Sequence, residues 1–230
     1  MGAAGTDRAW LSHPTIHTML ANRWNQLCEN VGLDGRAGWT AIATAYGEPG
    51  RAYHNLRHIA DCLRLLDEYA GLAADPVAVE FAIWFHDIVY DPRAADNEER
   101  SAGIAAEFLS STPYAAVVAD LIMATKHAVN ALTGDAALIC DIDQSILGRP
   151  PAEYGAYAAA IRLEYAWVPQ SQYAEARSRV LRGFLDRPAL FTHPAFQHRF
   201  GTQASVNLSW EIHLLAASAL PSSQARSDTR

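Results

Sequence analysis

Positive charge is scarce in this sequence, and lysine is almost absent from it. Only Lys126 among the 18 basic residues is a lysine, and 25 acidic residues give the 230-residue chain a formal net charge of −7. Surfaces that bind nucleic-acid polymers or anionic membranes need concentrated Lys and Arg. The composition therefore argues against such partners, although it leaves room for a local phosphate pocket.

The sequence is also poor in cysteine and has no long apolar run. Its three cysteines, Cys28, Cys62 and Cys140, are scattered without CxxC spacing, which fits a reducing compartment. The N-terminus has no apolar core of a signal peptide, and no run of about 18 apolar residues exists to span a bilayer. We therefore expect a cytoplasmic protein without a membrane partner.

Alternating strand patterns, repeats and low-complexity tracts are missing as well. Half of the residues are apolar, and they recur at helical spacing between caps and breakers. We expect an all-α fold, with a single domain over residues 1–220 and a disordered tail over 221–230. Helices are expected over about 14–29, 39–46, 55–70, 75–91, 97–109, 113–127, 135–147, 154–165, 169–185 and from 194 onward. The last helix is expected to be buried because of its apolar residues, Val206, Leu208, Trp210, Ile212, Leu214 and Leu215.

An adjacent His86–Asp87 pair lies inside the most apolar of these segments. Asp75 before Pro76 predicts the start of a helix, and Asp91 before a proline predicts its end. Bulky apolar residues surround the pair on all sides of this helix, which is typical of a buried element. Burying an imidazole and a carboxylate is costly unless each has a strong partner, and a cation would satisfy both.

Two other expected helices carry polar residues that could complete such a site. His58 lies above Cys62 at the edge of the apolar face of the helix that Asn55 caps, so it should point inward. In the helix over 135–147, Asp143 shares an apolar face, whereas Asp141 lies on a more polar one. We therefore expect Asp143 to face the site and Asp141 to support it from behind.

These residues form a set of two imidazoles and two carboxylates, namely His58, His86, Asp87 and Asp143. The mixed nitrogen and oxygen donors suit Mn, Fe, Co, Ni or Zn, with positions left for water. Because two carboxylates cancel the charge of a divalent ion, the whole set could be buried together.

The surrounding motifs are specific as a set. They are Tyr53-His54-Asn55-x-x-His58-Ile59, Phe85-His86-Asp87-x-x-Tyr90-Asp91, Asn97-Glu98-x-x-Ser101-Ala102, Asp141-x-Asp143-x-Ser145-Ile146-Leu147-Gly148, Tyr154-x-x-Tyr157, Ile161-Arg162-x-Glu164-Tyr165 and Asn207-Leu208. In this order they resemble a group of predicted metal-dependent phosphohydrolases of the HD superfamily, over roughly residues 53–215. The resemblance implies an HD-type helical bundle with its metal-site core at about 53–150 and additional C-terminal helices.

The resemblance also implies a role for individual residues, with the four predicted ligands holding one divalent ion (Mn, Mg, Fe, Co, Ni or Zn). Asp91 matches an acidic position that some HD hydrolases use in proton transfer, although Tyr90 replaces the glutamate that often precedes it. Glu98 stands where two-metal members often carry a further histidine, and His127 lies near the place of another. These two residues are candidates for outer support or for a second metal.

The implied reaction is hydrolysis of a phosphate ester of a small metabolite, for instance a nucleotide, by metal-activated water. Asp91 would orient or deprotonate that water, or protonate the leaving oxygen. The remaining phosphate charge requires a cationic side chain, for which Lys126, Arg57 and Arg162 are the candidates. The sequence leaves the oligomeric state open.

Two other functions are alternatives. One is a non-catalytic metal or nucleotide sensor, because Gly201 and Ser205 stand where this group is expected to carry an acidic residue and an arginine. The other is a di-iron oxygenase on the same scaffold, which needs two metals and more histidine ligands. Turnover of a phosphate ester separates the enzyme from the sensor, and the metal stoichiometry tests the oxygenase.

Overall fold

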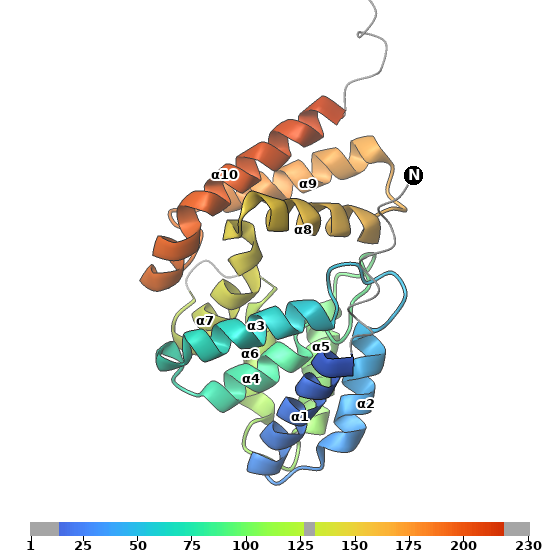
Figure 1. Cartoon of the computed structure of the whole chain (residues 1–230), viewed down its shortest axis with the longest axis vertical. Coiled ribbons are helices and arrows are strands. Elements are labelled where there is room, and N and C mark those ends of the chain that lie inside the picture. The colour runs from blue at the N-terminus through green and yellow to red at the C-terminus, as the bar shows by residue number, and fades with distance from the viewer. Residues whose placement is uncertain (1–13, 127–131, 219–230) are drawn as a thin grey trace, which may run out of the picture. The chain divides into compact units, whose positions relative to one another are not determined.

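The computed structural model describes residues 14–126 and 132–218. All regular secondary structure within these ranges is helical, which confirms the predicted all-α class (Figure 1). The chain divides into two compact units, residues 1–143 and 144–230, and each is described by itself below. The single domain over 1–220 stays a prediction, and the expected tail over 221–230 lies outside the described residues.

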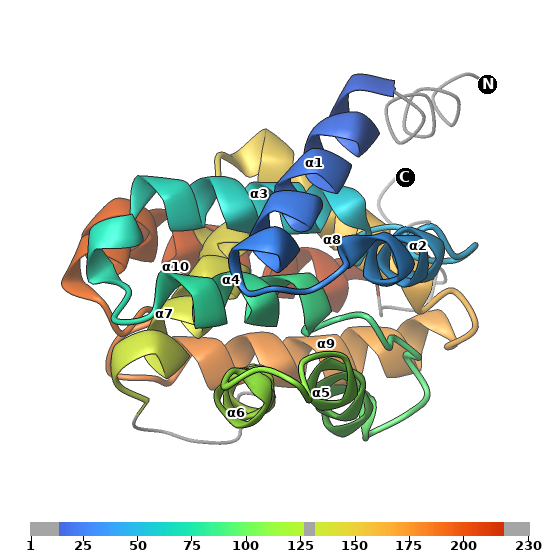
Figure 2. The same cartoon turned by 90° about the horizontal axis from the view of Figure 1, so that it is seen from below.

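The first unit consists of seven α-helices and one 3₁₀ turn within the described residues. They are α1 (Pro14–Asn30), α2 (Gly35–Tyr46), α3 (Leu56–Glu68), η1 (Ala70–Leu72), α4 (Pro76–Phe85), α5 (Asn97–Phe108), α6 (Ala115–Ala124) and α7 (Gly134–Gln144), whose last residue begins the second unit. Helix α4 packs against α3, α5 and α6, and α5 and α6 lie side by side (Figure 2). α4 is thus the central helix of this unit.

The core of the first unit is an aromatic cluster between α1 and α4. Trp24 is fully buried, and its ring centroid lies 5.6 Å from that of Trp84 and 5.8 Å from that of Phe81. Edge-to-face pairs of this kind add to the free energy gained from burial. The indole N–H of Trp24 donates to the Gly35 carbonyl at 2.7 Å, which joins α1 to the start of α2.

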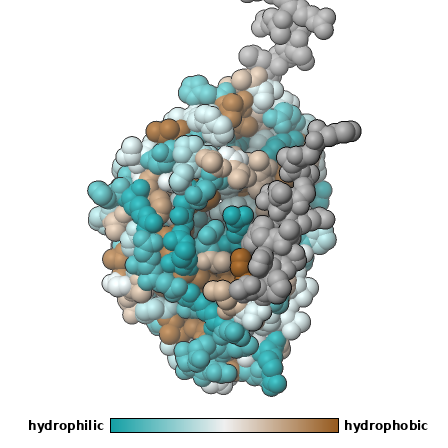
Figure 3. Space-filling model, viewed as in Figure 1, coloured by the Kyte–Doolittle hydropathy of each residue, from teal (hydrophilic) through white to brown (hydrophobic). Residues whose placement is uncertain are grey.

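The second unit contains a short 3₁₀ helix and three α-helices within the described residues. They are η2 (Ser145–Gly148), α8 (Pro151–Glu164), α9 (Gln170–Leu185) and α10 (Pro194–Ser218). Gly148 packs so closely on α10 that a Cβ atom there would lie 2.5 Å from the Phe200 carbonyl oxygen. In the space-filling view, apolar side chains occur in small scattered groups on the visible face (Figure 3). Among the described residues, no helix has the length and apolarity needed to cross a membrane.

Helix α4 is shorter than predicted, since it ends at Phe85 rather than near Asp91. The Ile88 N–H still donates to the Phe85 carbonyl at 3.0 Å, but the Val89 N–H donates to the Ser101 hydroxyl at 3.1 Å. Side chains from other segments therefore replace the helical hydrogen bonds beyond Phe85. As a result, His86 and Asp87 lie in a turn rather than inside a helix.

The prediction that α10 buries its apolar residues is only partly right. Leu208 and Leu215 are buried, but Val206, Trp210 and Leu214 are 46–56% exposed. Two polar residues of α10 take their place in the interior, and they are Asn207 and Glu211. Asn207 donates to the carbonyls of Leu147 and Arg149, both at 2.8 Å, so it ties α10 to η2.

Candidate metal centre

Asn55 sets the start of the helix that carries His58. Its side-chain oxygen accepts the Arg57 N–H at 2.9 Å, as the predicted N-cap should, and its amide group donates to the Ala52 carbonyl at 3.0 Å. The apolar face of α3 then turns His58 into the protein, where the residue is 4% exposed. The Cys62 sulfur lies one turn further, 3.7 Å from His58 Nδ1.

His86 is held in a fixed orientation by the end of α4. Its Nδ1 lies 2.9 Å from the Ile83 carbonyl oxygen. Because a carbonyl oxygen can only accept, Nδ1 carries the proton and donates it. In the neutral imidazole Nε2 then has the free lone pair, which is the state that metal-ligating histidines adopt.

Asp143 reaches the same place from α7. Its side chain is 21% exposed, whereas Asp141, two residues earlier, is 3% exposed as a residue. Asp143 lies close to both imidazoles, in agreement with the choice of Asp143 over Asp141. The reason given for that choice was wrong, because the face that carries Asp141 is the more buried one. The role of Asp141 behind the site stays a prediction.

The donor atoms of these residues converge. His58 Nε2 and His86 Nε2 lie 3.1 Å apart. Asp143 Oδ1 is 3.1 Å from the first nitrogen and 3.7 Å from the second. Asp87 Oδ2 mirrors it, at 3.7 Å from His58 Nε2 and 3.0 Å from His86 Nε2. One ligand atom each of His58, His86 and Asp143 falls in a group whose members all lie within 4.8 Å of one another.

The charges of this group depend on one another. Burial by itself lowers the pKa of His86, but the Asp87 carboxylate and then Asp143 outweigh it and raise that pKa well above its usual value. Burial would raise the pKa of Asp87, but the charge on His86 outweighs it and lowers that pKa below its usual range. The cluster therefore retains its carboxylate charge beside a positive charge, which a proton on His86 or a bound metal ion can supply.

This arrangement fits a divalent metal ion. Two imidazole nitrogens 3.1 Å apart repel each other through their lone pairs unless a proton or a cation lies beside them. The two carboxylates supply the negative charge that a divalent ion needs in a buried place. His58, His86 and Asp143 could therefore hold a metal ion, with Asp87 adjoining them.

The predicted catalytic residue lies a few residues beyond this cluster. Asp91 is exposed, its carboxylate accepts the Arg93 N–H at 2.9 Å, and its backbone exchanges two hydrogen bonds with the Asn97 side chain. Glu98 is half-buried in the first turn of α5. The catalytic role of Asp91 and the supporting role of Glu98 stay predictions, and His127 lies outside the described residues.

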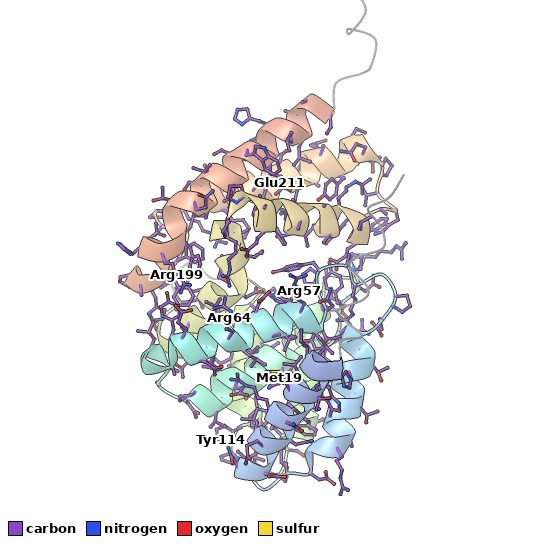
Figure 4. All side chains as sticks on the ribbon, viewed as in Figure 1. Met19, Arg57, Arg64, Tyr114, Arg199 and Glu211 are labelled. Carbon is purple, nitrogen blue, oxygen red and sulfur yellow. The ribbon has the colours of Figure 1, made fainter. Side chains whose placement is uncertain are left out.

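Two of the predicted substrate-binding residues also belong to the first unit. Lys126 donates to the Ala95 carbonyl at 2.9 Å and forms an ion pair with Glu99. Arg57 is exposed next to His58 in the first turn of α3 (Figure 4). Lys126 would have to exchange these contacts to bind a phosphate, and the roles of both residues stay predictions.

Arg162, the third candidate, belongs to the second unit. Its guanidinium donates to the carbonyls of Tyr165 and Val168 and to the Gln170 side chain, so it closes the end of α8. This contact set gives Arg162 a local structural role. Its predicted role in binding substrate stays a prediction.

Sequence reasoning missed Arg51, which binds the backbone beside the candidate metal ligands. Its side chain is 4% exposed and donates to the carbonyls of Asp87 and Ile88. The partners lie 36 and 37 residues further along the chain and are backbone atoms, so no local pattern points to them.

Comparisons with family models, curated proteins and solved structures give no match for this chain.

Proposed function

We propose that the protein is a metal-dependent phosphohydrolase that acts on a phosphate ester of a small metabolite. The observation that carries the proposal is the convergence of two imidazole nitrogens and two carboxylates, with Nε2 atoms 3.1 Å apart and each carboxylate within about 3 Å of one of them. The motif order that resembles the HD superfamily adds the reaction class.

The chemistry that a divalent ion supplies in such a site is polarisation of a phosphoryl oxygen and acidification of water, whose pKa falls from about 15.7 toward about 7. His58, His86, Asp87 and Asp143 are the residues that would hold the ion. His86 is oriented for this by its Nδ1–H, which the Ile83 carbonyl binds at 2.9 Å.

Proton transfer is assigned to Asp91 in this proposal. Its carboxylate is exposed, follows the ligand turn by four residues and is held by a local turn at Arg93. An exposed carboxylate can exchange its proton with solvent after each turnover. Arg57 is the cationic residue nearest in sequence to a ligand and is the first choice for binding the phosphate.

The test is turnover of a broad panel of phosphate esters with added Mn²⁺, in wild type and in His86→Ala and Asp87→Ala. We expect hydrolysis by wild type and a loss of at least about 100-fold in both variants, because each removes a donor from the cluster. His213→Ala and Asp61→Ala are matched controls, since both residues are exposed outside the cluster. The controls should retain wild-type rates.

The alternatives predict other results from the same samples. A folded protein that binds Mn²⁺ and turns over no ester would overturn the hydrolase and support a metal or nucleotide sensor. Metal analysis that gives two iron ions per chain would support a di-iron oxygenase instead. One ion per chain with ester turnover supports the hydrolase.

A further inference from the structure

Arg51 is a buried arginine whose guanidinium binds the turn after α4. One terminal nitrogen donates to the Asp87 carbonyl at 2.6 Å and the other to the Ile88 carbonyl at 2.9 Å. Its Nε donates to Glu48 at 3.1 Å, so the charge is balanced from its own loop. The N–H groups of a guanidinium lie in one plane, and no other side chain offers this set of donors.

The guanidinium of Arg51 also contacts two aromatic rings. The Arg51 guanidinium carbon lies 5.3 Å from the ring centroid of Tyr46 and 5.8 Å from that of Tyr90. Tyr46 donates its hydroxyl to the Trp84 carbonyl at 3.1 Å, which anchors this ring to α4. Arg51 is therefore a fixed part of the interior rather than a mobile surface side chain.

The two carbonyls that Arg51 binds lie where the helix no longer supplies partners. On the N-terminal side of Asp87, the His86 N–H still donates to the Ala82 carbonyl at 2.9 Å. On the C-terminal side, the two terminal nitrogens of Arg51 donate to the carbonyls of Asp87 and Ile88. The backbone of Asp87 is thus held on both sides, and this fixes the direction in which its carboxylate leaves the chain.

We infer that Arg51 is a positioning residue for the metal centre, acting through Asp87. It binds the backbone of Asp87 and not its carboxylate, and thereby sets where Asp87 Oδ2 lies, 3.0 Å from His86 Nε2. The inference rests on the metal site of the proposed function and does not depend on which reaction follows. Outer partners of metal ligands typically change metal affinity by 10–100-fold.

The test measures Co²⁺ affinity directly, by titration of the visible absorption of the bound ion and by calorimetry. We expect Arg51→Lys and Arg51→Gln to weaken Co²⁺ binding by about 10–100-fold and to alter the absorption band. Lysine cannot hold two carbonyls in one plane, so the conservative variant should not rescue binding. Arg64→Gln is the control, because Arg64 is an exposed arginine on α3 (Figure 4).

A double-mutant cycle separates positioning from general damage. If Arg51 acts through Asp87, then Arg51→Lys should have little further effect on Co²⁺ affinity in an Asp87→Asn background. Added guanidinium should restore part of the affinity of Arg51→Ala. Equal losses in both backgrounds, wild-type affinity in Arg51→Lys, or unfolding of every Arg51 variant would overturn the inference.

The outcome for the proposed function is distinguishable. A wild-type protein that binds Co²⁺ but hydrolyses no ester would end the hydrolase proposal, while the affinity pattern would still support Arg51. A wild-type protein that binds no divalent metal would overturn both.

Discussion

The two units of this protein satisfy their buried charges in different ways. In the second unit, Glu211 of α10 receives Arg177 Nε at 2.9 Å on one oxygen. Its other oxygen receives a second Arg177 nitrogen at 3.2 Å and the Tyr154 hydroxyl (Glu211 is labelled in Figure 4). One cation and one anion cancel, and both carboxylate oxygens have donors. This cluster is closed on itself.

The cluster in the first unit, formed by His58, His86, Asp87 and Asp143, is not closed in this way, and we call it the open cluster. Two carboxylates stand against two imidazoles whose Nε2 atoms face each other at 3.1 Å. Lone pairs that face each other across such a distance require a proton or a cation between them, and the two carboxylates favour a cation, whereas an Arg–Glu pair needs neither. A buried charged group therefore indicates a binding site only when its neighbours leave the charge or the lone pairs unbalanced.

The largest expected effect is on stability, from breaking the closed cluster. Glu211→Leu leaves the Arg177 guanidinium, 11% exposed, without its counter-charge. We expect the free energy of unfolding to fall by about 3–5 kcal/mol, measured by urea denaturation. Co²⁺ affinity should stay at the wild-type value, because Glu211 lies in the second unit and contributes no ligand.

The control for this prediction removes both charges together. Arg177→Met combined with Glu211→Leu leaves no uncompensated ion, so most of the lost stability should return. A double variant as unstable as Glu211→Leu alone would mean that lost packing, and not the unpaired arginine, explains the effect.

The next largest effect is on metal binding in the open cluster. Asp143→Asn removes one carboxylate charge and one donor, and we expect more than about 100-fold weaker binding of Mn²⁺ or Co²⁺. The rise in melting temperature that saturating metal gives the wild type should be lost with it. Asp141→Asn, on the same helix, should weaken metal binding by about 10-fold. A larger loss in Asp141→Asn than in Asp143→Asn would reassign the ligand.

Local sequence signals were sufficient to predict much of the open cluster. Asn55 and Asp75 cap α3 and α4 as predicted, because an N-cap depends only on the next few residues. The apolar spacing of α3 placed His58 on an inward face, since helical periodicity fixes direction over short distances. The same argument was less reliable in α7, where Asp141 on the more polar face is the more buried residue. These signals depend on neighbouring residues alone, so they can be interpreted without knowledge of the tertiary structure.

The parts that the sequence did not predict depend on distant partners. Helix α4 ends at Phe85 because Arg51 and Ser101 bind the backbone of residues 87–89 from other segments. Similarly, Glu211 is buried because Arg177 and Tyr154 pair with it, while Trp210 beside it is exposed. Hydropathy alone ranks Trp210 above Glu211 for burial, and only the tertiary partners reverse that order.

A smaller effect is expected from the cap of the helix that carries His58. Asn55→Ala removes the acceptor for the Arg57 N–H and the donor to the Ala52 carbonyl. We expect the free energy of unfolding to fall by about 1–2 kcal/mol in thermal or urea denaturation. Asn30→Ala, at the exposed end of α1, is the control and should stay within about 0.5 kcal/mol of wild type.

The smallest effect is expected at a third charged group, which is only partly buried. Arg23 of α1 binds Asp67 at 2.7 Å and Glu80 at 2.8 Å, and its side chain is 27% exposed. Because solvent screens such a group, Arg23→Gln should cost about 1 kcal/mol, and less in 1 M salt, where the Debye length is about 3 Å. Arg64→Gln, in a more exposed pair, should cost no more than about 0.5 kcal/mol. Arg23→Gln could instead lower the free energy of unfolding at high salt as much as Glu211→Leu does. The extent of burial would then not determine the stability effect of these charged clusters, and the contrast between the closed and open clusters would rest on their geometry alone.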